Sequence, residues 1–78
     1  MLVVLRFAEV MELKLLENSH KQGWGQLSPK WLLNRLRQET RELEGALKTG
    51  TPELIAREAA DVANFAMMIA DNAGGLKK

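Results

Sequence analysis

Apolar residues recur at helical spacing in three segments of the chain. At about 100° per residue, the apolar positions of each segment fall on one face of a helix. In the second segment these positions are Leu32, Leu33, Leu36, Leu43, Ala46 and Leu47. The pattern predicts helices over about residues 2–21, 29–48 and 52–73. No stretch alternates apolar with polar residues as a half-buried strand does, so the predicted fold class is all-α.

Helix start and stop signals separate the three segments. Ser28-Pro29 and Thr51-Pro52 each read as an N-cap followed by proline at the first helical position. Gly50 stands where a helix commonly ends, and the Gly74-Gly75 pair ends the third segment. We therefore expect one helical domain over residues 1–78, with a frayed tail at 74–78.

The composition narrows the sources of stability. A chain of 78 residues buries little apolar surface alone, and without cysteine it forms no disulfide. Eleven Lys and Arg against ten Asp and Glu give a net charge of +1, which argues against a nucleic-acid polymer as partner. A metal or a second copy of the chain remains, so we expect the three helices to complete a bundle by oligomerisation.

Signals for export or membrane insertion are missing from the pattern. Arg6 and Glu9 interrupt the apolar start of the chain before a signal-peptide core forms. The longest later apolar run covers residues 65–70, far short of the ~20 residues that span a bilayer. We therefore expect no membrane partner and a cytoplasmic location.

Four acidic residues interrupt the predicted apolar faces. Glu39 lies between the directions of Leu32 and Ala46, with Glu42 at the border of the same face, and Glu58 and Asp61 interrupt the face of the third helix. A buried carboxylate must be protonated, paired or bound to a metal. Each pair is spaced three residues apart and shares a helix face, so its members can grip one ion. Such oxygen ligands suit Mg²⁺ or Mn²⁺, and the pattern predicts a cleft for magnesium and a phosphorylated ligand.

Solvated ion pairs are the alternative interpretation. Four arginines lie near enough to pair with these acids, namely Arg35, Arg37, Arg41 and Arg57. One Glu-x-x-Glu alone would favour that alternative. Two pairs on consecutive helices, both within apolar faces, favour the metal.

Polar residues of other segments are candidates for contacts to a substrate. Lys14, Asn18 and Lys21 continue the apolar face of the first helix, where a lysine reaches a phosphate or lays its stem on the core. Trp24 is a candidate for stacking on a base or for packing at the helix junction. Asn64, three residues after Asp61, either hydrogen-bonds a substrate or faces water.

The two acidic motifs resemble those of a known family. Glu39-x-x-Glu42, a gap of 15 residues and Glu58-x-x-Asp61 are similar to the metal signature of the MazG-like all-α nucleoside triphosphate pyrophosphohydrolases. The surrounding residues 36–43 and 58–65 also resemble the family's two motif helices, and the similarity covers roughly residues 7–73.

The resemblance implies hydrolysis of a (deoxy)nucleoside triphosphate to the monophosphate and pyrophosphate, as in the removal of noncanonical or surplus nucleotides. It implies Mg²⁺ on Glu39, Glu42, Glu58 and Asp61, with water as nucleophile and Glu39 or Glu42 favoured as general base. Family members are dimers or tetramers with a further helix after the second motif, so a second subunit is expected to complete the site. Lys14, Asn18, Lys21, Trp24 and Asn64 are the predicted substrate contacts.

Two other hypotheses remain open at this point. In the first, the chain is a helical dimerisation or adaptor module without catalysis. In the second, it is a family member that binds nucleotides without turnover.

Overall fold

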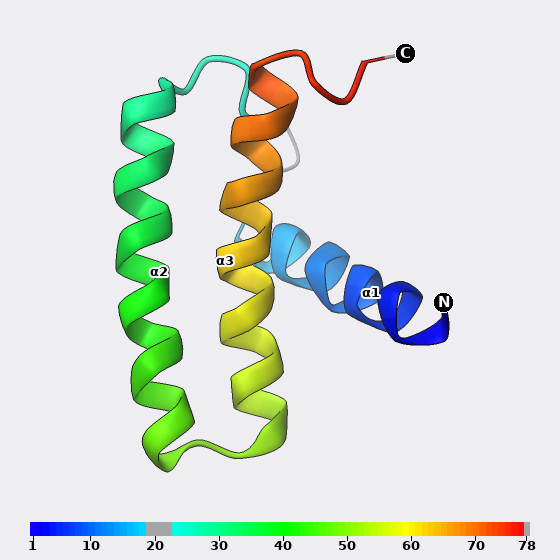
Figure 1. The fold of residues 1–78 in the computed structure, drawn as a ribbon, viewed down its shortest axis with the longest axis vertical. Helices are drawn as coiled ribbons and strands as arrows, with labels where there is room; N and C mark the ends of the chain where they lie inside the picture. Colours follow the sequence, from blue (N-terminus) through cyan, green and yellow to red (C-terminus); the bar gives the residue numbers. More distant parts are fainter. Residues whose placement is uncertain (19–22, 78) are drawn as a thin grey trace.

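The computed structural model describes residues 1–18 and 23–77, and the regular secondary structure in that part of the chain is helical. Three helices follow one another: α1 (Leu2–Glu17), α2 (Pro29–Thr49) and α3 (Pro52–Asn72), shown in Figure 1. The described residues contain no strand. The all-α prediction is therefore confirmed, and the three helices occupy the predicted segments.

The capping signals do what the sequence predicts. The Ser28 Oγ accepts a hydrogen bond of 3.1 Å from the Trp31 backbone N–H at the start of α2. The Thr51 Oγ1 accepts one of 3.2 Å from the Leu54 N–H at the start of α3. Each bond satisfies one of the amides that a helix N-terminus leaves without a partner.

Glycines end α2 and α3 in two different ways. Gly74 has a φ of +83°, and the bonds from Gly74 N to Asp71 O and from Gly75 N to Ala70 O form a Schellman motif. Gly50 is extended instead, with a φ of −86°. It is needed for space, because a Cβ there would lie 2.6 Å from the Ala46 carbonyl oxygen.

The first helix is shorter than predicted. It ends at Glu17, whereas the sequence pattern placed its end near residue 21. Asn18 leaves the helix with a ψ of 11°, in line with the low helix propensity of asparagine, and its side chain donates to Asp61 Oδ1 at 3.4 Å. The remainder of the predicted extension, residues 19–21, lies outside the described residues.

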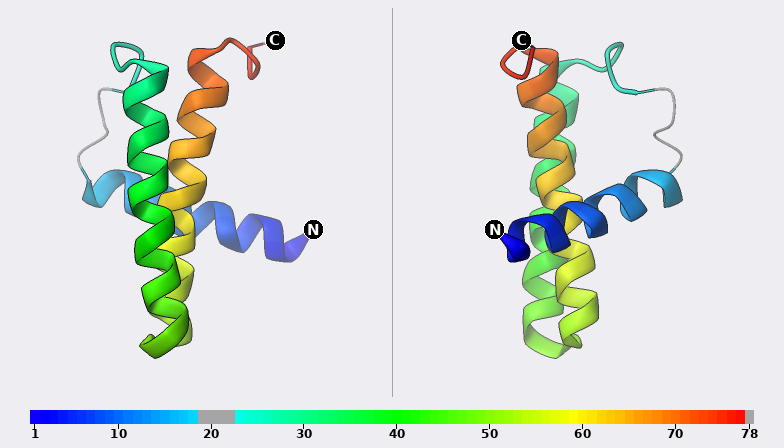
Figure 2. Two further views of the ribbon diagram at one scale, coloured as in Figure 1. Left: turned by 60° about the vertical axis from the view of Figure 1, so that its left-hand side comes forward. Right: turned by 90° about the vertical axis from the view of Figure 1, so that its right-hand side faces the viewer.

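Helices α2 and α3 form an antiparallel hairpin, and α1 lies across α3 rather than along it (Figures 1 and 2). Within the described residues the backbone of α1 comes close to α3 and not to α2. Leu32, Phe65 and Met68 form the centre of the core, and residues from α1 and from the segment before α2 pack around them. One face of the hairpin is therefore covered by α1 at its middle only.

This arrangement leaves part of the predicted apolar faces exposed. Leu33, Leu47 and Leu54 are exposed, with Leu47 at 63% of its maximum, because no described helix covers their side of the hairpin. The apolar faces of α2 and α3 are therefore not fully buried in the single chain. On α1 the exposed fractions run from 57 to 89% for Met1, Leu2, Val3, Val4, Leu5, Leu13 and Leu16.

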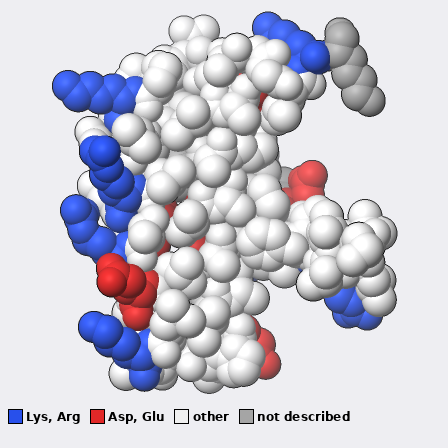
Figure 3. Space-filling view, viewed as in Figure 1, with Lys and Arg blue, Asp and Glu red and all other residues white. Residues whose placement is uncertain are grey.

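The outer face of α2 is basic. Lys30, Arg37, Arg41 and Lys48 are exposed and fall on one side of the helix, and Figure 3 shows Lys and Arg side chains along that edge. Among the described helices, none combines the length and apolar character that crossing a membrane requires.

A set of hydrogen bonds ties the segment before α2 to the end of α3. The Trp24 Nε1–H donates to Asp71 Oδ2 at 3.0 Å. The Asn72 side-chain amide donates to the carbonyl oxygens of Trp24 and Leu27 at 3.1 and 3.0 Å. We call these contacts the loop tie, because they fix the residues that lead into α2.

Candidate metal centre

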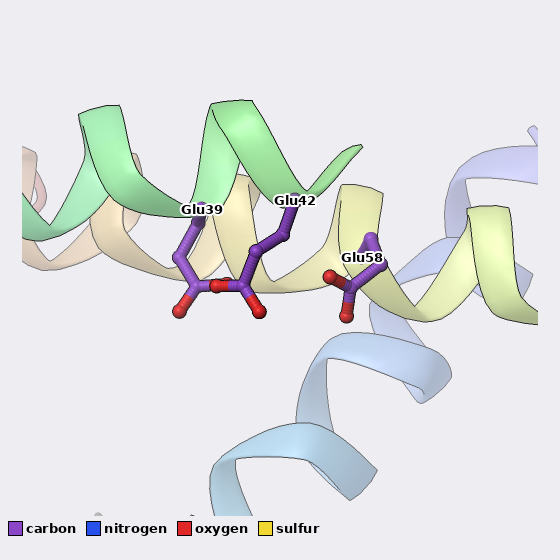
Figure 4. Close-up of side chains that lie close together, drawn as sticks. All are labelled: Glu39, Glu42 and Glu58. Atoms are coloured by element: carbon purple, nitrogen blue, oxygen red, sulfur yellow. The ribbon is translucent and has the colours of Figure 1, made fainter. Parts of the chain in front are cut away.

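Three of the four predicted acids come together in the hairpin. Glu39 and Glu42 lie one turn apart on α2, and the antiparallel pairing with α3 brings Glu58 beside them. One carboxylate oxygen from each lies within 4.8 Å of the others. Figure 4 shows the three carboxyl groups pointing to the same side of the hairpin. We call Glu39, Glu42 and Glu58 the acid cluster.

Glu39 is the buried member of the acid cluster, with 6% of its surface exposed. The Arg35 guanidinium, one turn earlier on α2, donates to Glu39 Oε1 at 3.0 Å and also contacts Gln38. Burial first, and then the neighbouring Glu42 and Asp61, raise the pKa of Glu39 to about 7, and Arg35 offsets only part of the rise. Its carboxyl group is therefore close to half ionised at neutral pH.

The surroundings of Glu58 also disfavour its ionised form. Its pKa is raised by burial first, and then by the negative charges of Glu42 and Asp61. Lys14 and Arg57 lower it by a smaller amount. Glu42, the exposed member, leaves the cluster open to solvent on its side. The acid cluster thus combines a buried carboxylate, that of Glu39, with an exposed one, that of Glu42.

Asp61 has the predicted burial but different partners. Its side chain is 9% exposed, and it lies one turn after Glu58 on α3. The Lys14 ammonium lies 3.4 Å from Asp61 Oδ2, and the Asn18 amide donates to Oδ1 at 3.4 Å. The structure thus groups three of the predicted acids as neighbours, while the fourth faces two side chains of α1.

Lys14 and Asn18 therefore lie next to the acids, as the face of the first helix predicts. Lys14 also reaches Glu17 Oε1 at 3.6 Å, and Glu17 in turn accepts two hydrogen bonds from Arg57 on α3. Arg57 lowers the pKa of Glu17 through these bonds. Sequence reasoning missed this link between α1 and α3, because no local spacing relates residues that are 40 positions apart.

Asn64 is buried, so the alternative that it faces water is wrong. Its exposed fraction is 3%, and its Nδ2 donates to the Met11 carbonyl oxygen of α1 at 3.0 Å. The Asn64 Oδ1 is buried and has no hydrogen-bond partner among the described residues. The predicted contact of Asn64 with a substrate stays a prediction.

The other two predicted substrate contacts lie away from the acid cluster or outside the described part. Trp24 belongs to the loop tie and packs against the core around Leu32 and Phe65. Its partner Asp71 lies 13 residues after Glu58, roughly 20 Å along α3. Lys21 lies outside the described residues. Sequence reasoning also missed Asp71 and Asn72 as the partners of this loop.

The donor set of the acid cluster fits a hard divalent cation. Three carboxylates at this spacing offer oxygen ligands, which Mg²⁺ and Mn²⁺ prefer over the sulfur and nitrogen that zinc favours. Burial first, and then the neighbouring carboxylates, raise the pKa values of Glu39 and Glu58, and nearby positive side chains offset only part of the rise. A bound cation would add positive charge beside these acids.

Comparison of the chain with known protein families, curated proteins and solved structures finds no match. The resemblance to the MazG-like family therefore stays a prediction from the two acidic motifs.

Proposed function

We propose that the chain is a Mg²⁺-dependent hydrolase that converts a (deoxy)nucleoside triphosphate to the monophosphate and pyrophosphate. The observation that carries the proposal is the acid cluster, in which carboxylate oxygens from α2 and α3 lie within 4.8 Å of one another. Its open rim at Glu42 leaves access for a phosphate chain, and Mn²⁺ can replace Mg²⁺ on the same oxygen ligands. The acidic motifs support the same reaction through the family they resemble.

In this proposal Glu39, Glu42 and Glu58 hold the cation, and Asp61 is the fourth ligand that the motif predicts. Bound Mg²⁺ draws electron density from the attacked phosphoryl group and makes a coordinated water more acidic. One of the two glutamates of α2, Glu39 or Glu42, would accept the proton of that water in place of serving as a ligand. Lys14 and Asn18 lie beside Asp61 and are candidates for contacting the phosphates of the substrate.

We further propose that the active form is a homodimer or homotetramer. The exposed apolar residues of α1, together with Leu33 and Leu47 of α2, offer apolar surface for association. Association through these surfaces would complete the helical bundle around the hairpin. Sedimentation of the purified chain at several concentrations tests this part, and a monomer at all of them would refute it.

The same exposed surfaces favour a second candidate, a helical dimerisation or adaptor module without catalysis. In that case Mg²⁺ leaves the melting temperature unchanged. A third candidate is a protein that binds nucleotides without turning them over, which the pairing of Asp61 with Lys14 favours. Calorimetric titration of a triphosphate in Ca²⁺, beside a turnover assay in Mg²⁺, separates this candidate from the enzyme.

The deciding experiment measures pyrophosphate release from a panel of nucleoside triphosphates in Mg²⁺. We expect Glu58→Gln to abolish release, because it removes a charged ligand from the acid cluster. Glu53→Gln is the matched control, since Glu53 is an exposed glutamate in the first turn of the same helix. Release of inorganic phosphate instead of pyrophosphate, or equal loss in both variants, would contradict the proposal.

A further inference from the structure

Lys14 is the one buried lysine or arginine among the described residues. Its side chain is 11% exposed, and its ammonium lies 3.4 Å from Asp61 Oδ2. A buried ammonium is stable only beside an anion, and here the anion is one of the four acids of the motifs. Lys14 comes from α1, whereas the acids come from α2 and α3.

Asp61 belongs to the electrostatic field of the acid cluster although its oxygens point to α1. It follows Glu58 by three residues on α3, so the two side chains share a face of that helix. Both of its oxygens are engaged, one by Lys14 and the other by Asn18. Asp61 is therefore close enough to act on the other acids and is held by α1.

A divalent cation in the acid cluster changes the balance at Asp61. It attracts the Asp61 carboxylate more strongly than a single ammonium does, and it repels Lys14. The two cations therefore compete for the same group. The contact between Asn18 and Asp61 is long at 3.4 Å, so it offers little resistance to a change of partner.

We propose that Lys14 is the resident counter-ion of the acidic site and that a divalent metal displaces it from Asp61. This inference rests on the proposed function, because it concerns the same metal site. Lys14 is then a positioning residue, which holds Asp61 in the metal-free chain and releases it as the metal binds. Removing its charge strengthens metal binding, whereas a purely structural role for Lys14 leaves that binding unchanged.

The test measures Mn²⁺ binding to the purified chain through the electron paramagnetic resonance signal of the free ion, with no nucleotide present. We expect Lys14→Met to bind Mn²⁺ about tenfold more tightly than the unmodified chain, because the charge that competes for Asp61 is gone. Lys14→Arg keeps the charge and should bind no more tightly. Should Lys14→Met not fold, Lys14→Gln removes the charge and keeps a donor for Asp61.

Two controls separate a contact to Asp61 from a general charge effect. Arg57→Gln also removes a positive charge that acts on Glu58 and Asp61, but the Arg57 guanidinium is paired with Glu17. We expect it to change Mn²⁺ affinity much less than Lys14→Met. In an Asp61→Asn background the gain from Lys14→Met should disappear, because the group for which the cations compete is gone.

Equal Mn²⁺ affinity in the unmodified chain and the uncharged Lys14 variants would overturn the inference. A gain that persists in the Asp61→Asn background would also overturn it. If the expected pattern of Mn²⁺ affinities is found but no pyrophosphate is released from any triphosphate, the proposed function fails and the exchange at Asp61 stands. Absence of Mn²⁺ binding in all variants refutes both.

Discussion

Helix α3 carries two polar regions that are built in opposite ways. At its C-terminal end the loop tie pairs Asp71 with the Trp24 N–H and places the Asn72 amide on two carbonyl oxygens. Nearer its start, Glu58 faces two further glutamates. The donors of the loop tie each meet an acceptor, whereas the acid cluster gathers acceptors that repel one another.

The difference separates polar groups that support the fold from polar groups that work against it. Satisfied hydrogen bonds such as those of the loop tie stabilise the folded chain by a modest amount each. Like charges that share a partly buried site destabilise it and raise the pKa of the acids concerned. An arrangement of the second kind, embedded in the contact between two helices, is a candidate for binding a cation.

The largest effect is expected for Glu39→Gln. In Mg²⁺ we expect pyrophosphate release to fall more than about 100-fold, because a charged oxygen ligand of the acid cluster is lost. Without metal the same variant should be more stable by about 1 kcal/mol, because one of the mutually repelling charges is gone. A turnover assay and a thermal melt in a metal chelator measure the two effects.

The prediction depends on the opposite directions of the two effects: Glu39→Gln should lower the rate of pyrophosphate release and raise the stability of the metal-free chain. Glu44→Gln is the control, since Glu44 is an exposed glutamate of the same helix and is not part of the acid cluster. It should change neither quantity. A loss of stability in Glu39→Gln would mean that the carboxylate supports the fold through Arg35, as a group of the loop tie does.

The second prediction concerns pH. The pKa of Glu39 is raised from 4.5 to about 7 in the folded chain. Between these values the folded chain binds more protons than the unfolded chain, so the stability falls as pH rises through that window. We expect a loss of the order of 3 kcal/mol from pH 4.5 to above 7, at about 1.4 kcal/mol for each unit by which the pKa of Glu39 is raised. Thermal melts across this range measure it.

Saturating Mg²⁺ should reverse this pH trend. Metal binding needs ionised carboxylates, so its stabilising effect grows as pH rises through 7. Glu39→Gln should remove most of the pH dependence of the metal-free chain, while Glu53→Gln should keep it. The same pH profile with and without Mg²⁺ would show that the acid cluster does not take up the ion.

The local features of both regions could be predicted from the sequence, and their tertiary partners could not. Ser28 and Thr51 cap their helices as predicted, because a cap depends on residues three positions away. The apolar face of α2 likewise placed Glu39 in a buried position. A helical face indicates which side is buried but not what covers it. The crossing of α1 over α3 therefore went unpredicted, and with it the exposure of Leu33 and Leu47.

The same limit applies to individual side chains. The sequence places Lys14 on the apolar face of the first helix, but its pairing with Asp61 depends on where α1 crosses α3 and could not be predicted. The partners of the loop tie are more than 40 residues apart in the chain, so no sequence spacing relates them. Tertiary contacts of this kind decide whether an acid is satisfied or left for a ligand.

The third prediction tests the loop tie. Asn72→Ala removes both hydrogen bonds to the carbonyl oxygens of Trp24 and Leu27. We expect a loss of about 1–2 kcal/mol, which lowers the melting temperature by roughly 5–10 °C in a domain of this size. Mn²⁺ affinity should not change. The exposed Asn34→Ala is the control, and an effect of Asn72→Ala on Mn²⁺ affinity would mean that the two regions are coupled.

The smallest effect on stability is expected for a substitution of Trp24. This residue belongs to the loop tie and is also a predicted substrate contact. Trp24→Phe removes the N–H that donates to Asp71 but keeps an aromatic ring against the core. Because Asp71 is half-buried and water can replace the lost donor, we expect a loss of about 0.5–1 kcal/mol. If the loop tie is the whole role of Trp24, KM for the preferred triphosphate stays the same.

Trp24→Leu decides between the two roles of this side chain. It removes the donor and also the flat ring on which a base would stack, a contact worth about 1–3 kcal/mol when it is present. A rise in KM in Trp24→Leu but not in Trp24→Phe would show that the ring meets the base. Unchanged KM in both variants, together with a lower melting temperature, would assign Trp24 to the fold. The region that binds the substrate would then be confined to the acid cluster and the side chains of α1 that face it.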